Sequence, residues 1–267
     1  MCNLRSHEVL TLLSVSSAKT ACSTPTTAYA ITPDVIAGSY PERMAQLGYR
    51  DKPGWRDMSD FVVHFTRYGN VAPFDTLEQI LHSLEVKAML PFGMARNMVA
   101  VTPTQKSACF SEIPLDMLTR LVSHMRSSYG LGFHQSLIVS QGGGRVWYAD
   151  KAGAIAQSLA KLNARALGPP FNPDDPFWEI SPFIDQPGDY GGRYRFEWER
   201  EWRVPGGLTF TDRELKFVFA PEEDHILVDG IFEYLDHFEI ADINCPIIDP
   251  LWPEQRIQEE LELISKP

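Results

Sequence analysis

Apolar and charged residues alternate along residues 196–204, and this alternation predicts a β-strand. Successive side chains of a strand point to opposite faces. Four apolar residues would share one face: Phe196, Trp198, Trp202 and Val204. Four charged residues would share the other: Glu197, Glu199, Glu201 and Arg203. Arg200 interrupts the apolar face, and carboxylates only about 6.5–7 Å apart along the strand would repel one another.

The acidic face of this strand has two interpretations. Most runs of charge are solvated surface, in which case Arg203 relieves part of the repulsion. In the other interpretation, Glu201 and Glu199 form a carboxylate site that acts on a substrate. A Pro-, Gly- and Asp-rich stretch, residues 168–195, precedes the strand. Long irregular loops beside regular elements are often binding loops, so both interpretations stay open.

The spacing of apolar residues predicts further strands and helices on both sides of this strand. Strands are expected at residues 61–66, 98–101, 108–111, 136–139, 146–148 and 215–219. Helices are expected from a capping box of Asp75 and Glu78, from Pro114, and at residues 151–166, 230–235 and 253 onward. The glycines of residues 142–144 indicate a hairpin turn between two of the strands.

The order of these elements favours the α+β class, because strands and helices mix without a regular β-α-β repeat. The 267 residues, 44% of them hydrophobic, suffice for one large domain. We expect a weakly patterned extension at residues 1–57, a main domain at 58–252 and an amphipathic helix at 253–267. Met58 directly precedes the first clear strand, so a start there, with residues 1–57 outside the native protein, is an alternative.

The charge and the cysteines narrow the range of partners and compartments. The net charge is −11 without a block of Lys and Arg, which argues against strong non-specific binding to nucleic acid or membranes. A small local basic patch stays compatible with it. The four cysteines are scattered, which fits a reducing cytoplasm. No apolar run reaches the ~20 residues of a membrane span. Residues 9–15 only loosely resemble a signal peptide.

Several familiar chemistries have no motif in this chain. The seven histidines show neither HxH nor HExxH spacing, so we expect no metal site. A nucleophile elbow, a phosphate loop and a GxGxxG turn are also missing. Cys109 beside Phe110 has no base nearby in sequence and is interpreted as a buried thiol. His64, within an apolar strand, is either a hydrogen-bonded core residue or part of a site.

An ordered set of short motifs resembles a known family. The motifs are HFTR at residues 64–67, LEQIL at 77–81, ACFSEIPL at 108–115, YG at 129–130 and EREWR at 199–203. They resemble the AbiGi-type abortive-infection family of phage-resistance proteins. Their order is also similar to the ADP-ribosyltransferase fold, including DarT-like nucleic-acid-modifying toxins. The resemblance covers about residues 58–220 and implies an ADP-ribosyltransferase-like mixed sheet core with flanking helices.

The resemblance also implies roles for individual residues. Glu201 would be the catalytic carboxylate that stabilises an oxocarbenium-like transition state, and Glu199 would orient or deprotonate the acceptor. His64 and Thr66 would hold the adenosine-side ribose of NAD. Arg96 would pair with the pyrophosphate and assist catalysis. A last contact is expected from Phe110, which would stack on the ligand, because the strand at 108–111 lacks the tyrosine or Ser-Thr-Ser of other transferases.

The resemblance therefore predicts a cytoplasmic toxin-like transferase that consumes NAD as a substrate and needs no metal. The acceptor would be a nucleic acid or a protein. Two alternatives remain because a fold does not fix a function. One is a non-catalytic sensor or antitoxin-like binding protein on the same fold. The other is an NAD glycohydrolase that cleaves NAD without an acceptor.

Overall fold

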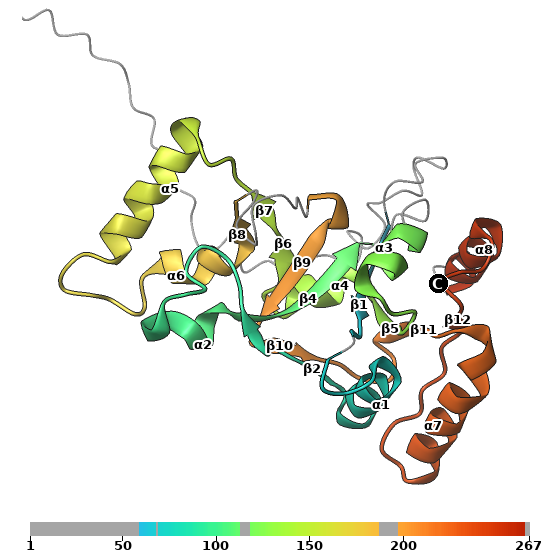
Figure 1. Ribbon diagram of the computed structural model, residues 1–267. Coiled ribbons are helices and arrows are strands. Elements are labelled where there is room, and N and C mark those ends of the chain that lie inside the picture. The colour runs from blue at the N-terminus through green and yellow to red at the C-terminus, as the bar shows by residue number, and fades with distance from the viewer. Residues whose placement is uncertain (1–58, 68, 113–117, 187–196, 265–267) are drawn as a thin grey trace, which may run out of the picture. The chain divides into compact units, whose positions relative to one another are not determined.

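The protein is an α+β structure in which helices flank a mixed β-sheet, as Figure 1 shows for the computed structural model. The structure describes residues 59–67, 69–112, 118–186 and 197–264. All of them belong to the second of two compact units, Glu42–Pro267. The expected extension at residues 1–57 lies outside the described residues. The predicted α+β class is confirmed.

The main sheet has the strand order β12-β11-β5-β1-β4-β9-β6, with β3 beside β4. Its strands are β1 (Phe61–Phe65), β3 (Leu90–Pro91), β4 (Lys106–Glu112), β5 (Gly130–His134), β6 (Gly144–Arg145), β9 (Glu201–Pro205), β11 (Leu215–Phe219) and β12 (Ile247–Ile248). Neighbouring strands are antiparallel except for β11 and β12. Two small sheets pair β2 (Glu85–Lys87) with β10 (Gly207–Thr209), and β7 (Trp147–Tyr148) with β8 (Ile184–Asp185).

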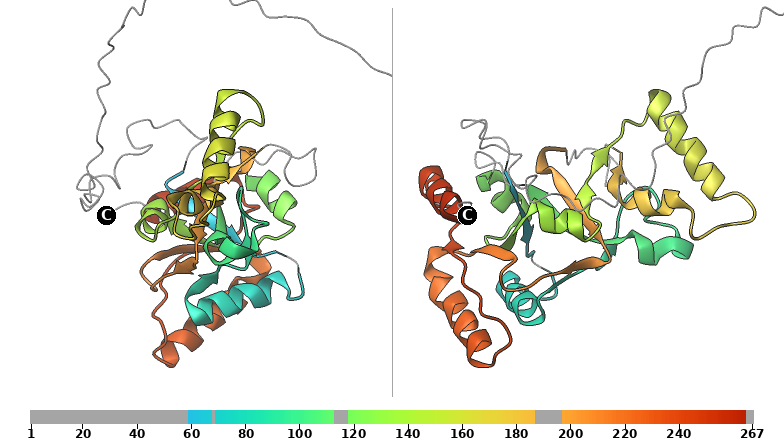
Figure 2. Two further views of the ribbon diagram at one scale, coloured as in Figure 1. Left: turned by 90° about the vertical axis from the view of Figure 1, so that its left-hand side faces the viewer. Right: turned by 180° about the vertical axis from the view of Figure 1, so that it is seen from behind.

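Helices cover both faces of the main sheet (Figure 2). The helices are α1 (Pro73–Ser83), α2 (Thr102–Gln105), α3 (Leu118–Met125), α4 (Gln135–Ser140), α5 (Gly153–Ala166), α6 (Pro176–Ile180), α7 (His225–His237) and α8 (Glu254–Ile264). α1 and α7 pack on one face through Leu77 and Leu235, while α3 and α8 pack on the other through Leu121 and Ile257. No helix in the described part of the chain is long and apolar enough to span a membrane.

Successive side chains of β1 point to opposite faces of the sheet, so this strand contributes to both cores. Val62 belongs to the core under α1 and α7, whereas Phe61, Val63 and Phe65 belong to the core under α3 and α8. A strand that buries both faces reads as a nearly continuous apolar run. The sequence FVVHF fits that description at every position except His64, which is only partly buried.

Two of the predicted strands are helical instead. Residues 98–101 fall in a 3₁₀ turn, Val99–Val101, and residues 136–139 fall in α4. Short apolar runs fit a buried strand or a helix equally well. At α4 the choice is made by His134, whose imidazole Nδ1 lies 3.2 Å from the backbone nitrogen of Ser136 and caps the helix. The expected hairpin at residues 142–144 is therefore also wrong.

The ends of several predicted helices differ from the structure. α1 begins at Pro73 after Ala72, so Asp75 lies in its first turn and is not its N-cap. A proline in the first turn is favourable because its missing N–H would have no helical partner there. α7 extends well beyond the predicted 230–235, and α8 confirms a helix after Pro253. The predicted helix start at Pro114 lies outside the described residues.

The strand predicted at residues 196–204 is shorter than expected. β9 begins only at Glu201, and Glu197–Glu199 form a 3₁₀ turn. Arg200, between the two, has a φ of 46°, a left-handed conformation that a strand cannot contain. The carbonyl of Arg200 still accepts a hydrogen bond from the backbone N–H of Glu112, at 3.3 Å. Glu199 and Glu201 therefore do not share one strand face.

Candidate functional site

The site begins where β1 and β4 separate in the middle of the sheet. The two strands pair only at Val62–Glu112 and Val63–Ser111. β1 nevertheless continues its pairing with β5 to Phe65–Gly130, and β4 continues with β9 back to Ser107–Pro205. The sheet thus divides into two halves that diverge from a short joint.

A cavity of about 1100 Å³ opens between the two halves and α1. Both sides of the gap contribute to its lining, with His64, Thr66 and Arg67 from the β1 side and Cys109, Glu201 and Arg203 from the β4–β9 side. Ligand cavities commonly measure about 300–1,000 Å³, so this one has room for a dinucleotide. The lining contains four carboxylates and three permanent cations: Glu78, Glu85, Glu199 and Glu201, with Arg67, Lys87 and Arg203.

His64 spans the gap between the two strands. Its Nδ1 lies 2.8 Å from the carbonyl oxygen of Cys109. A carbonyl oxygen only accepts, so Nδ1 carries the proton and donates. Burial lowers the pKa of His64, and the charge of Arg67 adds to this, although the bond to Cys109 raises it. The ring is therefore neutral at neutral pH, and its Nε2 is a hydrogen-bond acceptor.

Thr66 and Phe110 line the same cavity as His64. Thr66 is fully buried and its hydroxyl donates to the carbonyl of Tyr129 at 3.3 Å, so the oxygen keeps its lone pairs for an incoming donor. The ring of Phe110 lies 5.6 Å from that of His64 between centroids. All three residues line the cavity, His64 and Thr66 from the β1 side and Phe110 from β4.

Glu201 is held in place on both of its carboxylate oxygens. Arg203 Nε lies 2.9 Å from Glu201 Oε1, and Arg203 Nη2 lies 3.0 Å from Glu201 Oε2. The hydroxyl of Tyr148 donates to Oε2 at 3.2 Å. Arg203 is fully buried and also pairs with Asp185 and with the carbonyl of Pro182. Its guanidinium lies over the ring of Phe92, 4.6 Å from the centroid.

Glu199 reaches the cavity from the 3₁₀ turn, separately from β9. Its carboxylate is buried, and Oε1 lies 3.0 Å from Nε2 of His124 on α3. Burial lowers the pKa of His124, and the charges of Arg67, Arg120 and Arg126 lower it further. A neutral His124 donates its Nε2 proton to Glu199. The left-handed turn at Arg200 thus brings both predicted carboxylates to one cavity without a shared strand face.

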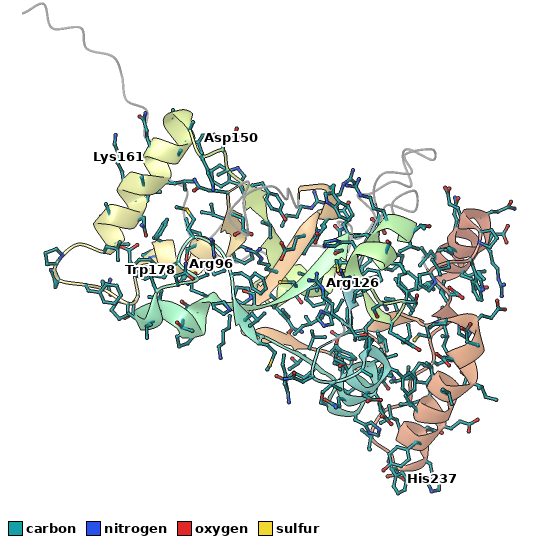
Figure 3. All side chains as sticks on the ribbon, viewed as in Figure 1. Arg96, Arg126, Asp150, Lys161, Trp178 and His237 are labelled. Carbon is teal, nitrogen blue, oxygen red and sulfur yellow. The ribbon has the colours of Figure 1, made fainter. Side chains whose placement is uncertain are left out.

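Arg96 does not line the cavity, contrary to the expectation that it faces the same cleft as His64. It is half-buried, and its guanidinium donates to the carbonyl of Gly93 at 2.9 Å. Figure 3 shows Arg96 well apart from Arg126, which follows the lining residue Met125. Residues 98–101, close to Arg96 in the chain, form a 3₁₀ turn and not the predicted strand. Arg67 is the exposed arginine that does line the cavity.

Sequence reasoning missed two partners of Glu201, Arg203 and Tyr148, and the carboxylate of Asp185 that pairs with Arg203. Arg203 was interpreted only as relief of repulsion, although its position two residues from Glu201 already indicated a pair. Asp185 lies within the stretch 168–195 that was expected to form a loop, and it belongs to β8. Tyr148 comes from β7, and no local pattern connects it to Glu201. Only the pairing of distant strands reveals this network.

Cys109 lies on the cavity wall opposite Arg203 in the β4–β9 register. Burial raises the pKa of its thiol well above the ordinary value, and the carboxylate of Glu201 raises it further. A protonated thiol is a poor nucleophile, as expected, but Cys109 is half-buried and not the fully buried thiol that the sequence predicted. Within the described ranges, no three His, Cys, Asp or Glu side chains are grouped so that they could hold a metal ion.

Comparisons of the chain with protein-family models, curated proteins and solved structures found no match.

Proposed function

We propose that this protein binds NAD in the cavity between β1 and β4 and transfers ADP-ribose to a macromolecular acceptor, a nucleic acid or a protein. In this proposal the sheet is an ADP-ribosyltransferase-like core, and the protein acts in abortive infection, as the motifs suggest. One observation carries the proposal. His64 and Glu201, which are 137 positions apart in the chain, line one cavity large enough for a dinucleotide.

The chemistry of the transfer suits Glu201. Breaking the bond between nicotinamide and ribose leaves positive charge on the sugar, so the transition state needs a fixed negative charge in a site poor in water. The side chain of Glu201 is only 12% exposed. Arg203 and Tyr148 both form hydrogen bonds to its carboxylate. Its orientation is therefore set before the substrate arrives, which is the condition for effective electrostatic stabilisation.

The other lining residues take roles around this carboxylate. Glu199 orients or deprotonates the acceptor. His64 accepts a ribose hydroxyl through Nε2, and Thr66 and Phe110 contact the adenosine side. Arg67 pairs with the pyrophosphate, since a guanidinium matches phosphate oxygens and Arg96 lies outside the cavity.

One observation favours the alternative of a non-catalytic binding protein. Both oxygens of Glu201 already accept hydrogen bonds from Arg203 or Tyr148. A pair of opposite charges presents a weaker field than a lone carboxylate does. The same cavity would then bind a nucleotide as a signal, and turnover would be absent.

The test combines calorimetry with NAD and measurement of nicotinamide release. Wild type should bind NAD, and release should rise when a nucleic-acid or protein acceptor is added. Glu201→Gln keeps the shape and removes the charge, so it should retain the fold and lose about 10²–10³ in rate. Glu233→Gln, an exposed glutamate of α7, is the matched control and should release nicotinamide like wild type.

The outcomes separate the functions under consideration. Release of nicotinamide that no acceptor accelerates would identify a glycohydrolase. Binding of NAD without release would favour the sensor or antitoxin-like protein. Absence of binding at millimolar NAD would reject the proposed ligand. Loss of phage protection in cells that carry Glu201→Gln, but not in those that carry Glu233→Gln, would connect the chemistry to defence.

A further inference from the structure

The segment that contains β6 and β7 joins two strands that carry acidic residues of the site. Arg145 pairs with Trp202 of β9, and the backbone N–H of Val146 donates to the carbonyl of Glu201 at 2.8 Å. Three residues later, the backbone N–H of Ala149 donates to the carbonyl of Asp185, also at 2.8 Å. The segment therefore fixes the backbone of β8 relative to that of β9.

The small sheet places two side chains against the Glu201–Arg203 pair. Tyr148 of β7 and Asp185 of β8 are register partners in the parallel pair. The Tyr148 hydroxyl donates to Glu201, while the Asp185 carboxylate accepts from Nη2 of Arg203. Asp185 is 2% exposed and Arg203 is 1% exposed, so water screens this ion pair little.

The charges of these groups do not cancel. Burial acts to lower the pKa of Arg203, but the carboxylates of Glu201 and Asp185 outweigh it, so the pKa lies well above its ordinary value. The guanidinium therefore carries one positive charge against two carboxylates, which leaves one net negative charge. Without Asp185, Glu201 and Arg203 would form a neutral pair. Glu201 and Arg203 line the cavity, whereas Asp185 lies behind them.

We propose that Asp185 is a positioning residue that offsets the charge of Arg203, so that Glu201 presents a full net negative charge to a cationic group of the ligand. The inference rests on the proposed function. There, the positively charged nicotinamide ring lies beside Glu201, as does the ribose cation that forms when the bond to nicotinamide breaks. Asp185 touches neither. It acts through Arg203, and its removal changes the field in the cavity while the lining residues stay the same.

The first test compares oxidised and reduced NAD by calorimetry, since the two differ mainly by the positive charge of the nicotinamide ring. Wild type should prefer oxidised NAD. Asp185→Asn should reduce this preference by about threefold to tenfold, because one charge is lost at a short distance in a poorly screened site. In turnover it should lower kcat more than it raises KM.

Asp175→Asn is the matched control for this substitution. Asp175 also pairs with an arginine, Arg165, at 2.9 Å, and it caps α6 through the backbone N–H of Phe177. Asparagine serves equally well as an N-cap, so the helix should remain. Asp175 does not line the cavity, and its substitution should leave the preference for oxidised NAD unchanged.

The second test needs no nucleotide. Cys109 lines the cavity, and its thiol responds to the charges of Glu201 and Arg203. With Asp185→Asn, Arg203 stabilises the thiolate more strongly. Alkylation of Cys109 by iodoacetamide, followed on its peptide by mass spectrometry, should then become about tenfold faster. Asp175→Asn should leave the alkylation rate as in wild type.

The two measurements separate this inference from the proposed function. An unchanged alkylation rate in folded Asp185→Asn would overturn the charge role of Asp185, whatever NAD does. Faster alkylation with an unchanged preference between the two forms of NAD would overturn the role toward the ligand. Faster alkylation without any NAD binding would reject the proposed function alone. Should Asp185→Asn fail to fold, Asp185→Ser removes the same charge with a smaller side chain whose hydroxyl can still accept from Arg203, and an unchanged alkylation rate in that folded variant would overturn the charge role.

Discussion

The Nδ1 atom of His64 lies 2.8 Å from the carbonyl oxygen of Cys109, immediately beyond the last residue pair that joins β1 to β4. A side chain thus donates where the backbone of β1 no longer reaches. Unpaired buried carbonyls are costly, so this contact satisfies β4 while the strands diverge. The opening of the cavity and the position of His64 therefore have one structural cause.

The neutral state of His64 predicts a dependence of stability on pH. Its pKa in the folded protein lies below the ordinary value of 6.5, chiefly because of burial. Above 6.5 the ring is neutral in both the folded and unfolded states and stability is unaffected. As pH falls from 6.5 toward the lowered pKa, the unfolded chain binds the proton first, so the free energy of unfolding decreases.

His64→Asn should weaken this dependence, because an asparagine amide can still donate toward Cys109 but does not titrate. Melting curves between about pH 7 and pH 5 should show a smaller loss of Tm in the variant than in wild type. Some loss will remain, since the pKa of His124 is also lowered. His237→Asn, on the exposed end of α7, should follow wild type. Identical curves for His64→Asn and wild type would contradict a lowered pKa of His64 in the folded protein.

Much of the fold could be predicted from local patterns. The strands around Val63, Cys109 and Val218 and the helix after Pro253 were all predicted, because apolar periodicity directly reflects burial. Wrong predictions concern short apolar runs such as residues 136–139, which form a helix whose N-cap is His134. A left-handed residue such as Arg200 has no sequence signal, since arginine rarely adopts that conformation.

Of the six candidate residues named from the sequence, all but Arg96 line one cavity, whereas the contacts that hold them there were not predicted. His64, Thr66, Phe110, Glu199 and Glu201 all line one cavity, and these came from ordered motifs. The groups that hold the Glu201–Arg203 pair from β7 and β8 depend on which strands pair, and local periodicity does not predict pairing between distant segments. Asp185 illustrates this, because it is a register partner of Tyr148 only through a two-residue parallel sheet.

A substitution at Gly132 should test the packing of β5 against β11. A Cβ there would lie 2.2 Å from Cζ of Phe217, which is fully buried and cannot move aside. Gly132→Ala should therefore lower the free energy of unfolding by about 1–3 kcal/mol in denaturant titrations. Gly230→Ala is the control, since a Cβ on this residue of α7 meets no atom within 4 Å. It should raise stability by up to about 1 kcal/mol, and equal losses in both variants would refute the steric argument.

The hydroxyl of Tyr148 should matter for turnover more than for folding. Tyr148→Phe removes the bond to Glu201 Oε2 but leaves the ring, and hydrogen bonds to charged groups contribute about 1.5–3 kcal/mol. Nicotinamide release should fall about tenfold to a hundredfold, and loss of the same hydrogen bond should lower Tm by several degrees without unfolding the protein at assay temperature. Tyr234→Phe, on the exposed side of α7, should keep the wild-type rate. Full activity in Tyr148→Phe would show that Arg203 alone orients the carboxylate.

Arg67 and Arg96 differ in their position relative to the cavity, and the sequence had assigned the pyrophosphate to Arg96 alone. Arg67 lines the cavity and is exposed, whereas Arg96 lies outside it and donates to Gly93. A guanidinium that pairs with a pyrophosphate contributes to binding in the ground state and the transition state alike, so its loss raises KM and leaves kcat nearly unchanged. Arg67→Gln should therefore weaken NAD binding about tenfold, as expected for loss of one charge-assisted contact.

Arg96→Gln is its matched partner and should bind NAD like wild type. The affinity of Arg67→Gln for NAD should also depend less on salt concentration than the affinity of wild type does. The substitution removes an exposed charge whose attraction to the pyrophosphate salt would screen. Calorimetry of both variants at two salt concentrations decides between the arginines. If Arg96→Gln loses affinity and Arg67→Gln does not, the ligand lies beyond the cavity, toward α2 and α6, and the site described between β1 and β4 does not hold the pyrophosphate.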